Sequence, residues 1–155
     1  MGGAFSCVAR RRGNMKRSSI LLLLIAVVLS GCGRTPPAPL GADAPADNVP
    51  SILGSFALNA NDPTGEQYGG TLTVFAGEAP NEYKLQWLVS GGIQEGSGVL
   101  EGNQLTFTWH SFEGTDQDVS GHGVYTVTVN GEMYGVRYID GVEAPGTESA
   151  YPNPK

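Results

Sequence analysis

From Ile52 onward, apolar and polar side chains alternate in short runs that Gly, Asn and Pro separate. In the run 83–89, for example, Lys84 and Gln86 fall between apolar residues at the odd positions. A period of two residues is typical of strands with one buried face. The pattern predicts eight strands, at 55–59, 67–75, 83–89, 93–100, 104–110, 123–129, 132–139 and 147–151. No stretch after position 40 has helical periodicity, so the fold class predicted is all-β.

Short connections separate these predicted strands. Asn130-Gly131 predicts a type I′ turn, which needs positive φ at both central residues. Glu101-Gly102-Asn103 and Ser90-Gly91-Gly92 are also typical of hairpin turns, and only Glu113–Ser120 is long enough for an extended loop. Consecutive hairpins form an antiparallel up-and-down meander, and eight such strands can close into a barrel without free edges. The alternative is a two-sheet β-sandwich.

A different pattern occupies the beginning of the chain. Residues 20–29 form a continuous apolar run behind a basic segment. The run is short for a transmembrane helix and has the length of a signal-peptide core. It leads into Leu29-Ser30-Gly31-Cys32, which resembles the lipobox of bacterial lipoproteins. In that family the cysteine sulfur receives a diacylglyceryl group and the chain is cut just before the cysteine.

The lipobox resemblance implies that Cys32 carries lipid and anchors the exported protein in a membrane of the cell envelope. In lipoproteins of bacteria with two membranes, an Asp after the cysteine favours the inner membrane. Gly33 stands there, which implies the outer membrane, or the outer face of the plasma membrane in an organism with one membrane. A plain signal peptide or a single-span anchor are the alternatives. Met15 is a second possible start of translation.

Three segments follow from these patterns. Residues 1–31 are the expected signal peptide, 32–50 the lipidated cysteine with a linker, and 51–155 the all-β domain. Prolines concentrate in the linker, at Pro36, Pro37, Pro39, Pro45 and Pro50. Such a composition favours an extended, semi-rigid tether.

Charge is distributed unevenly along the chain. The whole chain has a formal net charge of −6, but from Cys32 onward only four basic residues stand against fifteen acidic ones, a net charge of −11. An acidic surface repels phosphate backbones and anionic lipid headgroups. We therefore expect no nucleic-acid partner, and we expect membrane attachment to depend on the lipid.

Both cysteines, Cys7 and Cys32, precede the domain, which excludes a disulfide or a cysteine-ligated metal within it. The fold must therefore be stabilised by an apolar core to which aromatic residues contribute. They are Phe56, Tyr68, Phe75, Tyr83, Trp87, Phe107, Trp109, Tyr125, Tyr134 and Tyr138.

No catalytic motif is evident in the domain. The two histidines, His110 and His122, have Ser111 and Ser120 nearby, but adjacency in sequence does not make a catalytic triad. The segment 113–118 gathers carboxylates without the EF-hand spacing, so an acidic solvated loop is favoured over a calcium site. We expect a protein that is not an enzyme and has no cofactor and no bound metal.

The stretch 54–152 contains a series of short motifs. They include Tyr68-Gly69-Gly70-Thr71-Leu72-Thr73-Val74, Tyr83-Lys84-Leu85-Gln86-Trp87, Gly96-Ser97-Gly98-Val99-Leu100-Glu101-Gly102-Asn103 and Gly146-Thr147-Glu148-Ser149-Ala150-Tyr151-Pro152. The series resembles a group of small, exported, largely uncharacterised bacterial domains with avidin-like or lipocalin-like barrel character. Its elements are structural, so the resemblance implies a fold and not an activity.

Arg137 departs from that pattern, which has a tryptophan at this position. On the same face as Met133 and Gly135, Arg137 would enter the barrel and need acceptors or a ligand. With a bulge in the strand it would face solvent, and we favour this orientation because long basic side chains are rarely fully buried.

Trp87, Trp109 and Tyr125 either fill the barrel interior or line a cavity for one small apolar ligand. Core filling is favoured, since a domain of this size has few apolar residues to spare. We expect a membrane-anchored, non-enzymatic barrel that binds a small hydrophobic ligand or serves an envelope role. Trp87, Trp109, Tyr125 and Arg137 are the candidate ligand-binding residues. The alternative is an interaction domain for an envelope protein, acting through its outer face or the 113–120 loop.

Overall fold

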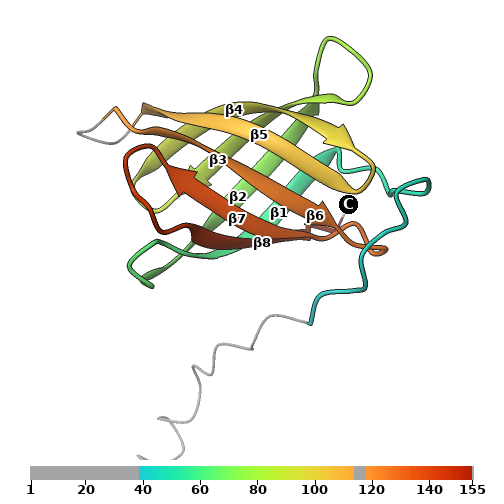
Figure 1. Cartoon of the computed structure of the whole chain (residues 1–155), viewed down its shortest axis with the longest axis horizontal. Helices are drawn as coiled ribbons and strands as arrows, with labels where there is room; N and C mark the ends of the chain where they lie inside the picture. The colour runs from blue at the N-terminus through green and yellow to red at the C-terminus, as the bar shows by residue number, and fades with distance from the viewer. Residues whose placement is uncertain (1–38, 114–117, 155) are drawn as a thin grey trace, which may run out of the picture. The chain divides into compact units, whose positions relative to one another are not determined.

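The computed structural model describes residues 39–113 and 118–154. The expected signal peptide and Cys32 lie outside these residues. The described part consists of eight antiparallel strands that follow one another around a closed barrel (Figure 1). They are β1 (Gly54–Asn61), β2 (Gln67–Ala76), β3 (Glu82–Val89), β4 (Gly92–Glu101), β5 (Gln104–Glu113), β6 (Ser120–Val127), β7 (Met133–Ile139) and β8 (Gly146–Pro152). The predicted all-β meander and its closure are confirmed, and the sandwich alternative is excluded.

Within residues 39–113 and 118–154, no helix is long and apolar enough to cross a membrane.

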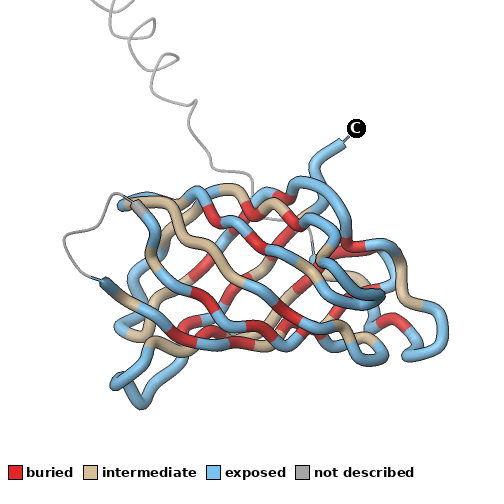
Figure 2. Tube along the Cα trace, turned by 90° about the horizontal axis from the view of Figure 1, so that it is seen from above, coloured by how far each residue is buried: buried red, intermediate tan, exposed pale blue. Residues whose placement is uncertain are grey.

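Side-chain alternation along the strands produces the barrel interior, as the repeating bands of buried residues in Figure 2 show. In β3, Leu85 and Trp87 are buried while Lys84 and Gln86 are exposed. The expected core membership of Phe75 is wrong: its side chain is 50% exposed. Phe75 pairs with Lys84 across β2 and β3, and directly paired residues point to the same face, so both face outward.

Two large rings on β5 fit inside the barrel because glycines flank them on both neighbouring strands. Trp109 pairs with Gly96 on β4 and Gly121 on β6. A Cβ added at Gly121 would lie 2.8 Å from Nε1 of Trp109. Phe107 is flanked in the same way by two glycines of the same strands. Small residues opposite large ones let the interior of a small barrel accommodate the rings.

The β6–β7 connection differs from the predicted turn. The amide of Gly131 donates to the carbonyl of Thr128 (3.0 Å), and the amide of Thr128 donates to the carbonyl of Glu132 (2.9 Å). Gly131 has φ +79°, whereas Asn130 does not have the positive φ that a type I′ turn requires. This is the three-residue hairpin loop in which a turn is followed by a glycine in the left-handed region. The predicted type I′ turn is wrong, and β6 ends two residues earlier than predicted.

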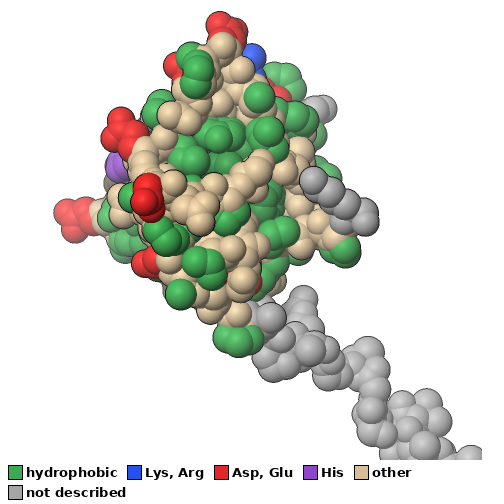
Figure 3. All heavy atoms as spheres, turned by 90° about the vertical axis from the view of Figure 1, so that its right-hand side faces the viewer, with side chains coloured by type: hydrophobic (Ala, Val, Ile, Leu, Met, Phe, Trp, Pro, Cys, Tyr) green, Lys and Arg blue, Asp and Glu red, His purple; other side chains and the backbone are tan. Residues whose placement is uncertain are grey.

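The end of the barrel that holds this loop is covered by residues 41–53, drawn in cyan on the right of Figure 1. The amide of Ala44 donates to the carbonyl of Val127 (2.9 Å), and the amide of Val129 donates to the carbonyl of Ala42 (2.8 Å). Ile52 is fully buried in the core. Part of the stretch expected as a linker thus lies against the barrel. Hydrophobic side chains gather in the middle of this end, with acidic ones at its margin (Figure 3).

Glu132 holds the covering segment in place. Its Oε2 accepts hydrogen bonds from the hydroxyl of Thr128 and from the amide of Gly41 (2.9 Å). The Thr128 hydroxyl, and to a smaller extent the Gly41 amide, lower the pKa of Glu132 below its ordinary value of 4.5. A lowered pKa in the folded state means that the contact stabilises the fold above the ordinary pKa. This stabilisation is lost as the pH falls through the folded-state pKa.

We therefore expect the Gly41 amide resonance to titrate with a midpoint below pH 4.5 in proton–nitrogen correlation spectra. The chemical shift reports the hydrogen bond because protonation weakens the acceptor. Glu132→Gln keeps an acceptor oxygen without the charge and should abolish the titration. A midpoint at or above 4.5 would contradict the inferred role of the carboxylate.

Candidate functional site

The opposite end of the barrel, called the mouth below, is where the β1–β2, β3–β4 and β7–β8 connections meet. A cavity of about 350 Å³ lies there. Its wall and rim combine apolar residues with polar ones from these connections and from the adjoining strands. They are Asp62, Pro63, Glu66, Gln67, Tyr68, Val89, Ser90, Gln94, Trp109, Arg137, Ile139 and Gly146. The other half of the interior is filled by the core cluster, so the barrel is solid at one end and hollowed at the other.

An ion pair forms the floor of this cavity. Nη1 of Arg137 lies 3.0 Å from Oε1 of Glu148, and their side chains are 5% and 0% exposed. Arg137 comes from β7 and Glu148 from β8, which are paired strands, and both residues face inward. Two charges removed from water lose several kcal/mol of hydration each, and this loss is offset only by close contact and additional hydrogen bonds.

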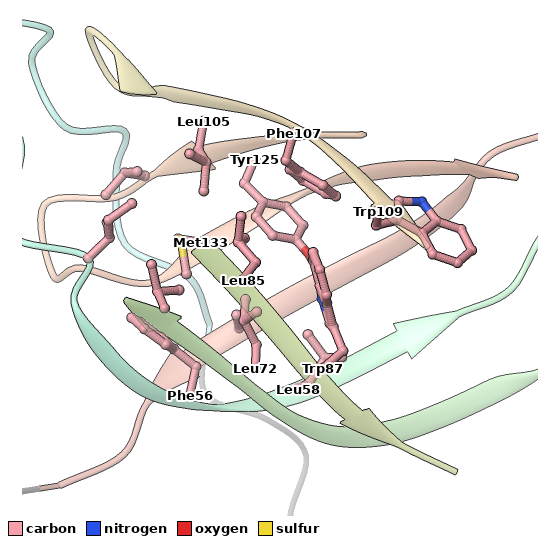
Figure 4. Packing of buried hydrophobic residues seen from close by; sticks show 14 residues of the cluster. Phe56, Leu58, Leu72, Leu85, Trp87, Leu105, Phe107, Trp109, Tyr125 and Met133 are labelled. Carbon is pink, nitrogen blue, oxygen red and sulfur yellow. The ribbon is translucent and has the colours of Figure 1, made fainter. Parts of the chain in front are cut away.

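Two tyrosine hydroxyls supply such additional bonds to Glu148. Tyr68 donates to Oε1 of the carboxylate, and Tyr125 donates to Oε2. The indole of Trp87 in turn donates to the Tyr125 hydroxyl (3.2 Å), and Figure 4 shows the two side chains pointing toward each other. Burial, and secondly the negative charge of Glu148, raise the pKa of both tyrosines. Both hydroxyls therefore stay protonated at neutral pH and act as donors.

The guanidinium of Arg137 is held on its other sides by aromatic rings and an amide. Its carbon atom lies 3.7 Å from the ring centre of Trp109 and 4.7 Å from that of Trp87. These distances fit cation–π contacts. Nη2 donates to Oε1 of Gln94 (2.6 Å). Nε is buried, and among the described residues it has no hydrogen-bond partner. The floor therefore retains one unused donor.

The four candidate ligand-binding residues come together in this cluster, but in different roles. Trp109 and Arg137 line the cavity, whereas Trp87 and Tyr125 are fully buried beneath it. The favoured solvent-facing orientation of Arg137 is wrong. Arg137 pairs with Gly123 and Gly146 without a bulge, and the flanking glycines leave room for its side chain inside the barrel.

Sequence reasoning missed Glu148, Tyr68 and Gln94. Glu148 lies in the closing motif of the domain, which the resemblance marks as structural. Its alternation with Ala150 in β8 places it on the buried face, and a buried carboxylate requires donors. This need for donors could have indicated a pair between Glu148 and Arg137, the only inward-facing basic residue of the described strands.

The two histidines lie on the outer face, away from the cavity. His122 stacks on Tyr138 with ring centres 4.9 Å apart, and its Nδ1 lies 3.9 Å from Asp140. Ser120 donates to Asp140 (2.7 Å) and not to a histidine base. Residues 114–117 of the acidic segment lie outside the described residues. Among residues 39–113 and 118–154, no cluster of metal-ligating side chains is present.

A larger hollow of about 700 Å³ crosses the outer face of β3–β6. Exposed polar side chains such as Gln86, Ser97 and His110 line it. It contains no buried charged group comparable to the floor of the mouth. The mouth is therefore the stronger candidate for a binding site.

No protein-family model matches the chain, and no curated protein matches it in a sequence search.

Proposed function

We propose that this protein is a membrane-anchored, exported lipoprotein whose barrel binds a small, mainly hydrophobic molecule in the cavity at its mouth. Lipid on Cys32 anchors the chain, and the barrel is not an enzyme. Function is assigned to the cavity because functional groups, and not the fold, determine what a barrel does.

The buried Arg137–Glu148 pair beneath an open cavity is the observation that carries this proposal. Replacing a buried ion pair with apolar residues is often neutral or stabilising, so stability alone does not account for such a pair. A cavity of about 350 Å³ lies within the usual range for small-molecule sites, which are mainly apolar with a few placed polar groups. Val89, Trp109 and Ile139 supply the apolar wall.

Narrowing the cavity should abolish binding. Val89 lines the mouth, and the adjacent Leu88 is 59% exposed on the outer face. We expect Val89→Phe to weaken binding of octan-1-ol by about tenfold or more, which corresponds to about 1.4 kcal/mol. The matched control Leu88→Phe should bind as the unmodified protein does. Titration is followed by tryptophan emission, because Trp109 contacts the cavity.

Equal affinity of the two variants, with both folded, would contradict binding in the mouth. Absence of any emission change with small hydrophobic molecules would do the same. The outer face would then be the stronger candidate. It carries the exposed hydrophobic side chains Phe75, Val99 and Phe112, which favour the alternative of an interaction with an envelope protein.

The anchor is tested separately. Cys32→Ser removes the sulfur that accepts lipid in bacterial lipoproteins, so the variant should leave the membrane fraction and lack the diacylglyceryl mass. Two acyl chains provide stable attachment at about 0.8 kcal/mol per buried CH₂. Ser30→Thr is the matched control variant, because it changes a residue near the cleavage site and keeps the cysteine. Unchanged membrane fractionation of Cys32→Ser would overturn the lipoprotein assignment.

A further inference from the structure

We infer that the molecule bound in the mouth is a small amphiphile with a positively charged polar end, such as an alkylamine, and not a carboxylate or a phosphate. This inference rests on the proposed binding function. It follows from the charges that line the cavity and from the counter-charge that its single basic residue already has in Glu148. Nε of Arg137 stays available to a neutral acceptor, since it has no partner among the described residues.

A carboxylate ligand would be expected to bind next to Arg137, but the positive charge of Arg137 is compensated by Glu148. Nη1 is bonded to Glu148, Nη2 is bonded to Gln94, and the face of the guanidinium lies against Trp109. Glu148 is fully buried directly behind it. An anion placed over Arg137 would therefore meet the nearby carboxylate as well, and attraction and repulsion would largely cancel.

The rim adds uncompensated negative charge. Asp62 and Glu66, from the β1–β2 connection, line the cavity, and both are solvent-accessible. Asp62 is fixed by hydrogen bonds to its carboxylate from the hydroxyl of Thr64 (2.7 Å) and the amide of Glu66 (2.9 Å). The Thr64 hydroxyl is the main cause that lowers the pKa of Asp62, so the group is ionised at neutral pH.

Taken together, Arg137, Glu148, Asp62 and Glu66 give the mouth a formal net charge of −2. The other basic residue of the described part, Lys84, lies on the outer face. A field of one sign over a cleft raises the local concentration of ligands of the opposite sign. The apolar body of a cationic amphiphile would rest against Trp109, while its charged end remains at the rim near Asp62.

Three molecules that differ only in their polar end test this inference: octylammonium, octan-1-ol and octanoate. Each is titrated into the full chain carrying Cys32→Ser, without detergent, at pH 7 and low ionic strength, with tryptophan emission as the signal. We expect octylammonium to bind more tightly than octan-1-ol, and octanoate to bind most weakly. Each step should be at least about threefold, and added salt should reduce the differences.

A double variant, Asp62→Asn with Glu66→Gln, removes both rim charges and keeps hydrogen-bonding groups of similar size. It should reduce the preference for octylammonium over octanoate by about tenfold while octan-1-ol binds as before. Glu78→Gln with Glu101→Gln is the matched control. It changes the net charge equally at exposed positions in or beside the β2–β3 and β4–β5 turns, at the opposite end of the barrel, and should leave the preference unchanged.

The outcomes separate the two proposals. Octanoate binding as tightly as octylammonium, or more tightly, overturns this inference and leaves the binding function intact. The inference is also overturned if the rim double variant and the control double variant reduce the preference for octylammonium over octanoate equally. The effect would then come from the net charge of the protein and not from the rim. If none of the three molecules changes the emission, the binding function itself is overturned.

Discussion

Replacing Glu148 with alanine is expected to lower the free energy of unfolding by about 3–5 kcal/mol. The change leaves the guanidinium of Arg137 buried without its counter-charge. It also removes the acceptor of the Tyr68 and Tyr125 hydroxyls, and a buried donor without a partner loses its hydration without compensation. Urea unfolding of the full chain, followed by far-ultraviolet circular dichroism, measures the difference.

Two further variants separate charge from packing. Glu148→Gln keeps the shape of the side chain and one acceptor oxygen, so one of the two tyrosine hydroxyls still has an acceptor, but it leaves Arg137 uncompensated. Adding Arg137→Met to it removes the second charge, and the flexible thioether can still pack against Trp109. We expect the double variant to be more stable than Glu148→Gln alone. A loss below about 1 kcal/mol for Glu148→Ala would contradict a buried, coupled pair.

Truncating Trp87 to alanine is expected to destabilise the fold by about 3–5 kcal/mol. Its ring is fully buried and lies 5.4 Å from that of Phe107 between centres. It also donates to Tyr125 and contacts the guanidinium of Arg137. The barrel is closed by hydrogen bonds between all neighbouring strands, so its wall cannot collapse far into the vacated space.

The neighbouring residue provides the control for Trp87. Leu88 points outward and is 59% exposed, so Leu88→Ala should change stability by no more than about 0.5 kcal/mol. Trp87→Phe retains an aromatic ring but loses the indole donor, and an intermediate loss is expected. Similar stabilities for Trp87→Ala and Leu88→Ala in urea unfolding would show that the interior around Trp87 is not tightly packed.

Trp87 and the Arg137–Glu148 pair form the inner boundary of the mouth. Trp87 closes the solid half of the barrel, and the Arg137–Glu148 pair lies between that core and the cavity. The pair is bonded to side chains from β2, β4 and β6, so it links the strands that form the wall of the cavity. Such a floor would be preorganised for the proposed ligand, because most of its polar groups are fixed before anything binds.

Most of the fold could be predicted from the sequence because its determinants are local. Alternation in the run 83–89 assigns each side chain to a face, and the glycines at 91 and 102 mark tight hairpins. Short hairpins between eight strands leave a meander as the simplest topology. For the same reason, alternation in the sequence places Trp87, Trp109 and Tyr125 inside the barrel.

The tertiary structure decided which partners surround Arg137 at the floor of the mouth. Arg137 enters the barrel because the β6–β7 and β7–β8 registers place Gly123 and Gly146 beside it, and because Glu148 compensates its charge. The sequence determined that Arg137 occupies a strand in which inward-facing and outward-facing side chains alternate. Whether its charge could be buried depended on the register that places Glu148 of the next strand beside it, and on Gln94 and Tyr68, which strands distant in the chain contribute. Alternation is a property of neighbouring residues, whereas compensation of a buried charge is a property of the closed barrel.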